Sequence, residues 1–145
     1  MVTFQEESNV FEIERLLRAI AGTVRKKGRS ILVNFDITIP QFDALVYAFE
    51  SGNVTIGDLS AKLGLAYSTT TDLVDRLALR GYVVRVRDDE DKRVVRVRVQ
   101  EAGQRLIDEV LRARRAYLSG VLEKLADTEQ LHLKSVLQLL ERHLI

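Results

Sequence analysis

The stretch Val83–Val99, VVRVRDDEDKRVVRVRV, decides the fold of this 145-residue chain. Valine alternates with arginine on both sides of an acidic, polar segment, and this alternation has the period of a half-buried β-strand. Aspartate-rich turns commonly join such strands, so the pattern predicts a β-hairpin. The valines expected to face the core are Val84, Val86, Val95, Val97 and Val99. The arginines expected to face solvent are Arg85, Arg87, Arg96 and Arg98.

Two short helices are predicted just before this hairpin. Thr55, followed three residues later by Asp58, begins one helix, and Gly64 ends it. The next helix is expected from about Ser68 to Arg80. Two short helices joined by a glycine-containing turn are typical of a helix-turn-helix, whose second helix enters the DNA major groove. Serine and threonine at a helix start are also ordinary caps, so it is the following basic hairpin that favours a winged helix-turn-helix.

Helices are predicted on both sides of this module. A first helix should start between Thr3 and Asn9, carry an apolar seam that suits another helix, and stop at Gly28. A second should open at Thr38 with a capping box to Gln41. After the hairpin, a long helix from Glu101 to about Ala126 has more than one apolar stripe and should be buried on two sides, and a last helix should start at Asp127 or Thr128.

These elements predict a mainly α fold with a small β-hairpin wing (α+β). We expect residues 34–99 to form the winged helix-turn-helix DNA-binding domain. Residues 1–33 and 100–145 are expected to form a helical dimerisation region, because both ends of the chain carry apolar surface left for a partner subunit.

Charge and composition narrow the function. The net charge is only +1, but residues 76–98 hold eight basic and four acidic residues, a net +4 on a chain that is −3 elsewhere. A basic patch of this kind is the electrostatic footprint of phosphate contact, although it is also compatible with a solvated strand face. The basic residues of the patch are Arg76, Arg80, Arg85, Arg87, Lys92, Arg93, Arg96 and Arg98.

The chain lacks several features of other protein classes. No apolar run approaches the ~18 residues that span a bilayer, and the start, MVTFQEES, does not resemble a signal peptide. The absence of cysteine excludes disulfides and thiolate metal sites. We therefore expect a soluble cytoplasmic protein with no membrane partner and no cofactor.

The order of elements resembles the MarR family of winged helix-turn-helix transcriptional regulators. The most specific part is LVDRLALRGYVVR, followed by R-x-x-x-D-x-R and by Glu-Ala-Gly after the second strand. The resemblance covers nearly the whole chain. It implies a homodimer that binds a pseudo-palindromic double-stranded DNA. It also implies that a small anionic or aromatic effector can lower the affinity for DNA.

The resemblance also implies roles for particular residues. Arg93 matches the wing-tip arginine that enters the minor groove, whose negative potential attracts arginine where A·T pairs narrow it, and Asp91 would orient it. Arg76 matches a structural or phosphate-facing arginine. The remaining expected DNA contacts are Ser68, Thr69, Thr70 and Thr71 in the major groove, and Arg87 and Lys92 in the basic patch. Two residues depart from the family pattern: Gln100 replaces a capping threonine, and Asp72 brings a carboxylate that would repel phosphate or accept from a cytosine amino group.

The sequence also bears on three other functions. A metal-responsive regulator would need several ligands, yet His132 and His143 are the only histidines. An enzyme is disfavoured because the sequence has no phosphate loop and no nucleophile motif, and the carboxylates of residues 88–91 lie in an exposed turn. A winged-helix module for protein–protein contact would not need Arg93.

Overall fold

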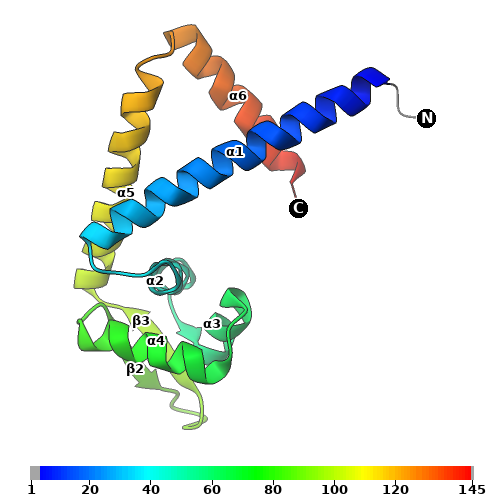
Figure 1. The fold of residues 1–145 in the computed structure, drawn as a ribbon. Coiled ribbons are helices and arrows are strands. Elements are labelled where there is room, and N and C mark those ends of the chain that lie inside the picture. Colours follow the sequence, from blue (N-terminus) through cyan, green and yellow to red (C-terminus); the bar gives the residue numbers. More distant parts are fainter. Residues whose placement is uncertain (1–3, 145) are drawn as a thin grey trace. The chain divides into compact units, whose positions relative to one another are not determined.

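The computed structural model describes residues 4–144, with side chains from Glu7 to Leu144 (Figure 1). The elements in chain order are α1 (Phe4–Asn34), α2 (Ile39–Ser51), β1 (Val54–Thr55), α3 (Ile56–Leu63), α4 (Tyr67–Leu79), β2 (Val83–Arg87), β3 (Val95–Val99), α5 (Glu101–Leu122) and α6 (Asp127–His143). The chain divides within α5 into two compact units, residues 1–110 and residues 111–145. The expected mainly α fold with a small sheet is confirmed.

Local capping signals place the short helices as the sequence predicts. The Gln41 amide donates to Thr38 Oγ1 at 3.3 Å, and the Thr38 amide donates to Gln41 Oε1 at 3.0 Å. Thr55 and Asp58 make the same reciprocal pair at 3.0 and 3.2 Å. Gly64 ends α3 in the left-handed region with φ 65°. Each box satisfies amides that a helix start leaves without partners, and this is why both helices begin where the motif stands.

The three strands form an antiparallel sheet in the order β1-β3-β2, so β3 is the central strand. Its register pairs Val83 with Val99, Arg85 with Val97, and Val86 with Arg96. Residues directly opposite in an antiparallel pair lie on the same face. The face that holds Val95, Val97 and Val99 therefore also holds Val83, Arg85 and Arg87.

The prediction that Val84 and Val86 face the core was therefore wrong. Both lie on the other face of the sheet, opposite Arg98 and Arg96, and Val84 is 38% exposed. Val83 and Val97 are the buried valines of the hairpin. Each arm alternates as expected, but the pairing of the two strands sets which residues of one arm share a face with which residues of the other.

The core of the first unit lies among α2, α3, α4, the sheet and the adjoining parts of α1 and α5. Leu32 at the end of α1 and Val110 in α5 are 1% and 0% exposed. Other large side chains that this core buries almost completely are those of Leu45, Ile56, Leu59, Thr70, Val74, Leu77 and Val97. Packing of this kind holds α4 and the sheet as one body, which fixes where the hairpin leaves the domain.

The first helix does not stop at Gly28, as the sequence predicted, but continues to Asn34. A glycine inside a helix costs only about 1 kcal/mol relative to alanine. Burial of Ile31 and Leu32 in the next turn outweighs that cost. Towards its N-terminus α1 is exposed, and the apolar residues exposed there are Val10, Phe11, Ile13, Leu16, Leu17, Ile20 and Val24.

The long helix α5 ends at Leu122 and not near Ala126. Its buried residues all lie in the first half, from Gly103 to Val110. The expectation of burial on two sides is not met within this chain, because Leu118 and Val121 are 49% and 41% exposed. In the second unit, α6 has no buried residue among those described.

Candidate nucleic-acid interface

The start of α4 presents a small polar surface. The helix is preceded by Ala66 as its N-cap residue, and no side chain makes a capping hydrogen bond there. Ser68 and Thr69 are exposed, and so is Asp72 one turn further along. The interpretation of Ser68 and Thr69 as caps is therefore not supported. Their hydroxyl groups are left available for polar contacts outside the helix.

Thr70 does not fit its expected role as a DNA contact. Its side chain is 0% exposed, and its hydroxyl donates to the Ala66 carbonyl at 3.0 Å. Thr71 is half-buried, and its Oγ1 is a buried atom without a hydrogen-bond partner. Helical periodicity explains the difference, because each residue turns the helix by about 100°, so four consecutive residues spread around the helix and cannot all share one face.

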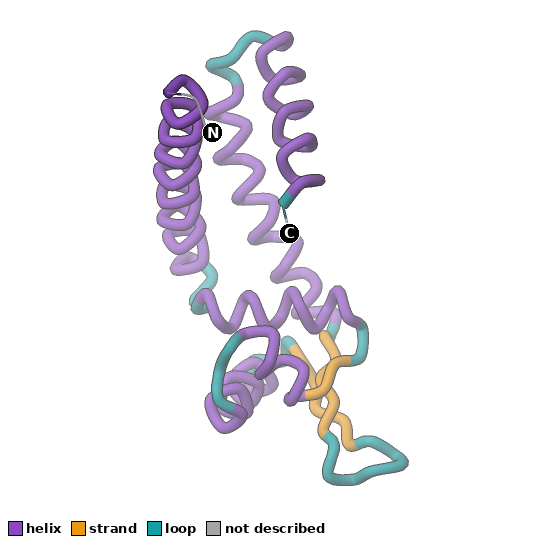
Figure 2. The backbone as a smooth tube through the Cα atoms, turned by 90° about the vertical axis from the view of Figure 1, so that its right-hand side faces the viewer, coloured by secondary structure: helices purple, strands orange, loops and turns teal. Residues whose placement is uncertain are grey.

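The loop between β2 and β3 carries the wing-tip arginine and projects from the hairpin (Figure 2). The Arg93 guanidinium donates from Nε and Nη2 to the two oxygens of Asp91 at 3.0 and 3.1 Å. The Arg93 side chain is nonetheless 91% exposed, while Asp91 is 44% exposed. This fork geometry restricts the guanidinium without covering it. The same bonds lower the pKa of Asp91 and raise that of Arg93.

Asp88 is a residue of this loop that the sequence interpretation did not select. Its Oδ1 accepts the amide of Glu90 at 2.9 Å, and its Oδ2 accepts from Arg96 Nε at 3.0 Å. Hydrogen bonds from the Glu90 amide and then from Arg96 lower the pKa of the Asp88 carboxyl. Aspartate at the end of a strand commonly binds amides two residues on, so its place before the acidic run was the available signal.

Another ion pair links the hairpin to α4. Arg85 Nη1 donates to Asp75 Oδ1, and the two side chains are 37% and 46% exposed. Arg85 therefore does not simply face solvent, as the alternation predicted. Arg87, Lys92 and Arg98 are exposed, as a phosphate-contacting surface requires.

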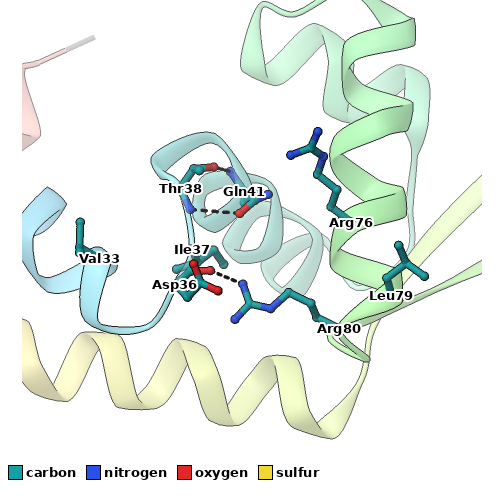
Figure 3. Close-up of a pocket in the computed structure, with 8 residues that line it drawn as sticks. All are labelled: Val33, Asp36, Ile37, Thr38, Gln41, Arg76, Leu79 and Arg80. Atoms are coloured by element: carbon teal, nitrogen blue, oxygen red, sulfur yellow. Dashed lines mark hydrogen bonds between the residues drawn. The ribbon is translucent and has the colours of Figure 1, made fainter.

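Arg76 lines an open cavity of about 550 Å³ in the first unit (Figure 3). Arg76 and Arg80 extend into this region from α4 and its C-cap, and Arg80 is held there by hydrogen bonds to the carbonyls of Asp36 and Phe35. The other lining residues are Val33, Asp36, Ile37, Thr38, Gln41 and Leu79. The Arg76 guanidinium beside aliphatic side chains suits an anion with an apolar body.

Among the described residues, no group of three or more histidine, cysteine, aspartate or glutamate side chains is placed so that it could hold a metal ion. Residues 4–144 contain no helix that is both long and apolar enough to cross a membrane.

Comparison with known proteins identifies the family. The model of the MarR family matches residues 37–95. The HTH-type transcriptional regulator YsmB of Bacillus subtilis is 44% identical over 128 residues, which cover 88% of each chain. A MarR family protein from Bacillus stearothermophilus is 47% identical with a TM-score of 0.83, over 94% of this chain and 95% of that one. A transcriptional regulator from Thermotoga maritima is 33% identical with a TM-score of 0.79, over 90% and 92% of the two chains.

These matches cover 88–95% of the chains compared, well beyond the winged module, and the relatives whose role is named are regulators of transcription and not enzymes. The chain therefore belongs to the MarR family of DNA-binding transcriptional regulators.

Proposed function

We propose that this chain acts in the cytoplasm as a homodimeric repressor that binds a pseudo-palindromic operator and is released by a small effector. The observation that carries the proposal is the wing tip, where Arg93 is 91% exposed yet held by both oxygens of Asp91. A guanidinium presented in this way suits insertion into a narrow minor groove.

The contacts that we propose fall into two sets. Ser68 and Thr69 at the exposed start of α4 contact base edges in the major groove, with half-buried Thr71 at the margin. Arg87, Lys92 and Arg93 on the wing contact phosphates and the minor groove, and Arg76 contacts the backbone or the effector. Thr70 is left out of the set because its side chain is buried.

Exposed apolar surface supports the homodimer. Val10, Ile13, Leu17, Ile20 and Val24 recur every three or four residues along α1 and are 42–66% exposed. A monomer rarely leaves a continuous seam of this kind in water, so a partner helix is the expected cover. Residues 1–33 and 100–145 remain the proposed dimerisation region. The two α4 helices, related by a twofold axis, would then sit about 34–36 Å apart, one helical turn of DNA.

The cavity at Arg76 supports an effector with an anionic group and an apolar or aromatic body. Arg76 supplies charge, and Val33 and Leu79 are exposed aliphatic side chains at its rim. An effector releases DNA only through its different affinities for the two conformations of the dimer. In the proposed mechanism, it favours a spacing of the two modules that no longer matches the operator.

The proposal is tested by selection from random duplex DNA with purified protein, beside Arg93→Ala. A pseudo-palindromic consensus is expected, and Arg93→Ala should weaken binding to it by about 1–3 kcal/mol without changing the fold. Arg18→Ala is the matched control, because Arg18 is also an exposed arginine paired with a nearby carboxylate, Glu14, but lies on α1. No enrichment by the wild-type protein, with or without candidate anions, would favour a module for protein–protein contact.

A further inference from the structure

Asp88 connects three parts of the wing. Its Oδ1 accepts the amides of Glu90 and Asp91 at 2.9 and 3.4 Å, so it organises the backbone just before Arg93. Its own amide donates to the Val94 carbonyl at 3.0 Å, which closes the loop. Its Oδ2 lies 3.0 Å from Nε and 2.9 Å from Nη2 of Arg96. The Asp88 side chain is only 19% exposed, although it lies in a surface loop.

Arg96 is a rigid anchor for this carboxylate. It lies on β3, the central strand, where its neighbours are Val86 on β2 and Thr55 on β1. The loop from Asp88 to Val94 has no comparable support, since its backbone hydrogen bonds join only its own ends and Asp91 to Val94. The Arg96 side chain is 32% exposed, in contrast to the 91% of Arg93. The two arginines therefore occupy different environments on one wing.

We propose that Asp88 and Arg96 are a positioning pair, which aims Arg93 through the loop backbone and does not itself contact DNA. The inference rests on the proposed function of the wing. Asp88 holds the amide of Glu90 at 2.9 Å and accepts the amide of Asp91 at the longer distance of 3.4 Å. Asp91 in turn holds Arg93 through its two oxygens, so the chain of contacts runs from the central strand to the guanidinium.

The reason for such a chain is preorganisation. An arginine that enters a minor groove must lose the freedom of its side chain and of the loop that carries it. A loop already fixed in the free protein loses less on binding, so affinity is higher for the same contacts. Because a narrow groove accepts the guanidinium over a small range of directions, the pair should matter most where A·T pairs flank the half-sites.

The test is a double-mutant cycle on the duplex selected by the wild-type protein. Arg96→Gln should weaken binding about tenfold, the size of coupling expected between residues of one hydrogen-bond network. In an Arg93→Ala background the same substitution should change affinity less than twofold, because the group it positions is gone. Asp88→Asn should behave like Arg96→Gln, since it retains one acceptor oxygen but removes the charge.

Arg98→Gln is the control for charge. Arg98 lies two residues along the same strand, on the same face, and is exposed. If it contacts phosphate, its effect should be the same with and without Arg93, and the same for A·T and G·C flanks. Arg96→Gln should instead lose its effect when the A·T flanks of the selected duplex are replaced by G·C.

The outcomes separate the two proposals. Equal effects of Arg96→Gln with and without Arg93 would overturn the positioning role and make Arg96 a direct phosphate contact. Wild-type affinity in Arg96→Gln, with Arg93→Ala still weak, would also overturn it, and the proposed function would stand. If Arg93→Ala binds as the wild type does, the proposed function of the wing fails first. Thermal unfolding of each variant shows whether it is folded. If Arg96→Gln is not folded, Arg96→Lys takes its place, because lysine retains the charge without the two-nitrogen contact.

Discussion

Single residues set the junction between the wing and α5. Gly103, the third residue of α5 and the last of the Glu-Ala-Gly segment, lies against the carbonyl of Tyr82. A Cβ at this position would lie 2.4 Å from that carbonyl oxygen and 2.9 Å from Val99 Cγ1. The Tyr82 carbonyl also accepts the Gln100 amide at 2.8 Å, so it cannot move away without loss of that bond.

Gly103→Ala should therefore destabilise the domain. The contact is with backbone, which relaxes less easily than a side chain, and overpacking of this kind costs about 1–3 kcal/mol. Urea denaturation followed by circular dichroism measures the change. Gly120→Ala is the matched control, because a Cβ there meets nothing within 4 Å. Equal stability of the two variants would mean that the start of α5 can shift.

The two bridged carboxylates of the wing predict a pH dependence. Hydrogen bonds lower the pKa of Asp88 and of Asp91 in the folded protein. A lowered pKa means that the contribution of these bonds is fully present above the unfolded value of about 3.9. It is lost as the pH falls through the folded pKa. The loop should therefore retain its structure from neutral pH down to about pH 4 and loosen only in stronger acid.

Carbon-detected NMR titration of the aspartate carboxyl groups measures these pKa values. Midpoints for Asp88 and Asp91 below about 3.9 are expected. In Arg96→Gln the midpoint of Asp88 should rise, because one of its hydrogen-bond donors is removed. A midpoint of Asp88 unchanged by that substitution would contradict the bridge in solution.

At the scale of elements, the wing is joined to α4 as well as to the rest of the sheet. The pair between Arg85 of β2 and Asp75 of α4 spans the two elements that the proposal places in neighbouring grooves. It is partly exposed, so its contribution to stability should be small. Its consequence is geometric, because it restrains the angle between the hairpin and α4.

A double-mutant cycle of Asp75→Ala and Arg85→Ala should give a coupling free energy of about 0.2–1 kcal/mol in urea denaturation. Binding of the selected duplex should be weakened by each single variant and not further by the second, because either one releases the same restraint. Strictly additive losses of DNA affinity would instead indicate that Arg85 contacts phosphate directly.

At the scale of the whole molecule, the proposed dimer predicts that apolar residues of α1 are needed for assembly. Ile13→Asp combined with Leu17→Asp places two charges on the exposed seam. Sedimentation should show a monomer, whereas Arg18→Ala leaves the assembly unchanged. Because the seam is exposed in the single chain, the winged module should keep its helical content in the charged variant. A dimer of undiminished stability would place the interface elsewhere.

The proposed dimer also predicts the salt dependence of DNA binding. A dimer that neutralises roughly 6–10 phosphates should lose about 10³–10⁵ in affinity between 50 and 200 mM salt. Fluorescence anisotropy with the selected duplex measures the slope. The charged α1 variant should show a clearly smaller slope, since one module contacts about half as many phosphates. Equal slopes would mean that the bound species are the same.

The sequence alone determined where the capped helices and the hairpin lie. Capping boxes at Thr38 and Thr55, the alternation around residues 88–94 and the glycine at the end of α3 are local signals, and local hydrogen bonds decide those boundaries. The contact between Asp91 and Arg93 could be predicted from the sequence for the same reason, because the two partners are only two residues apart.

Only the tertiary structure decided how the elements face one another. The pairing of β2 with β3 put Val84 and Val86 on the face of the arginines, although each arm alternates as predicted. Burial takes Thr70 out of the proposed DNA contacts. It also explains why α1 continues past Gly28, because Ile31 and Leu32 reach the core. Arg96 pairs with Asp88 and Arg85 pairs with Asp75, and the partners are eight and ten residues apart in the chain. Such contacts depend on strand register and helix packing, which no local pattern specifies.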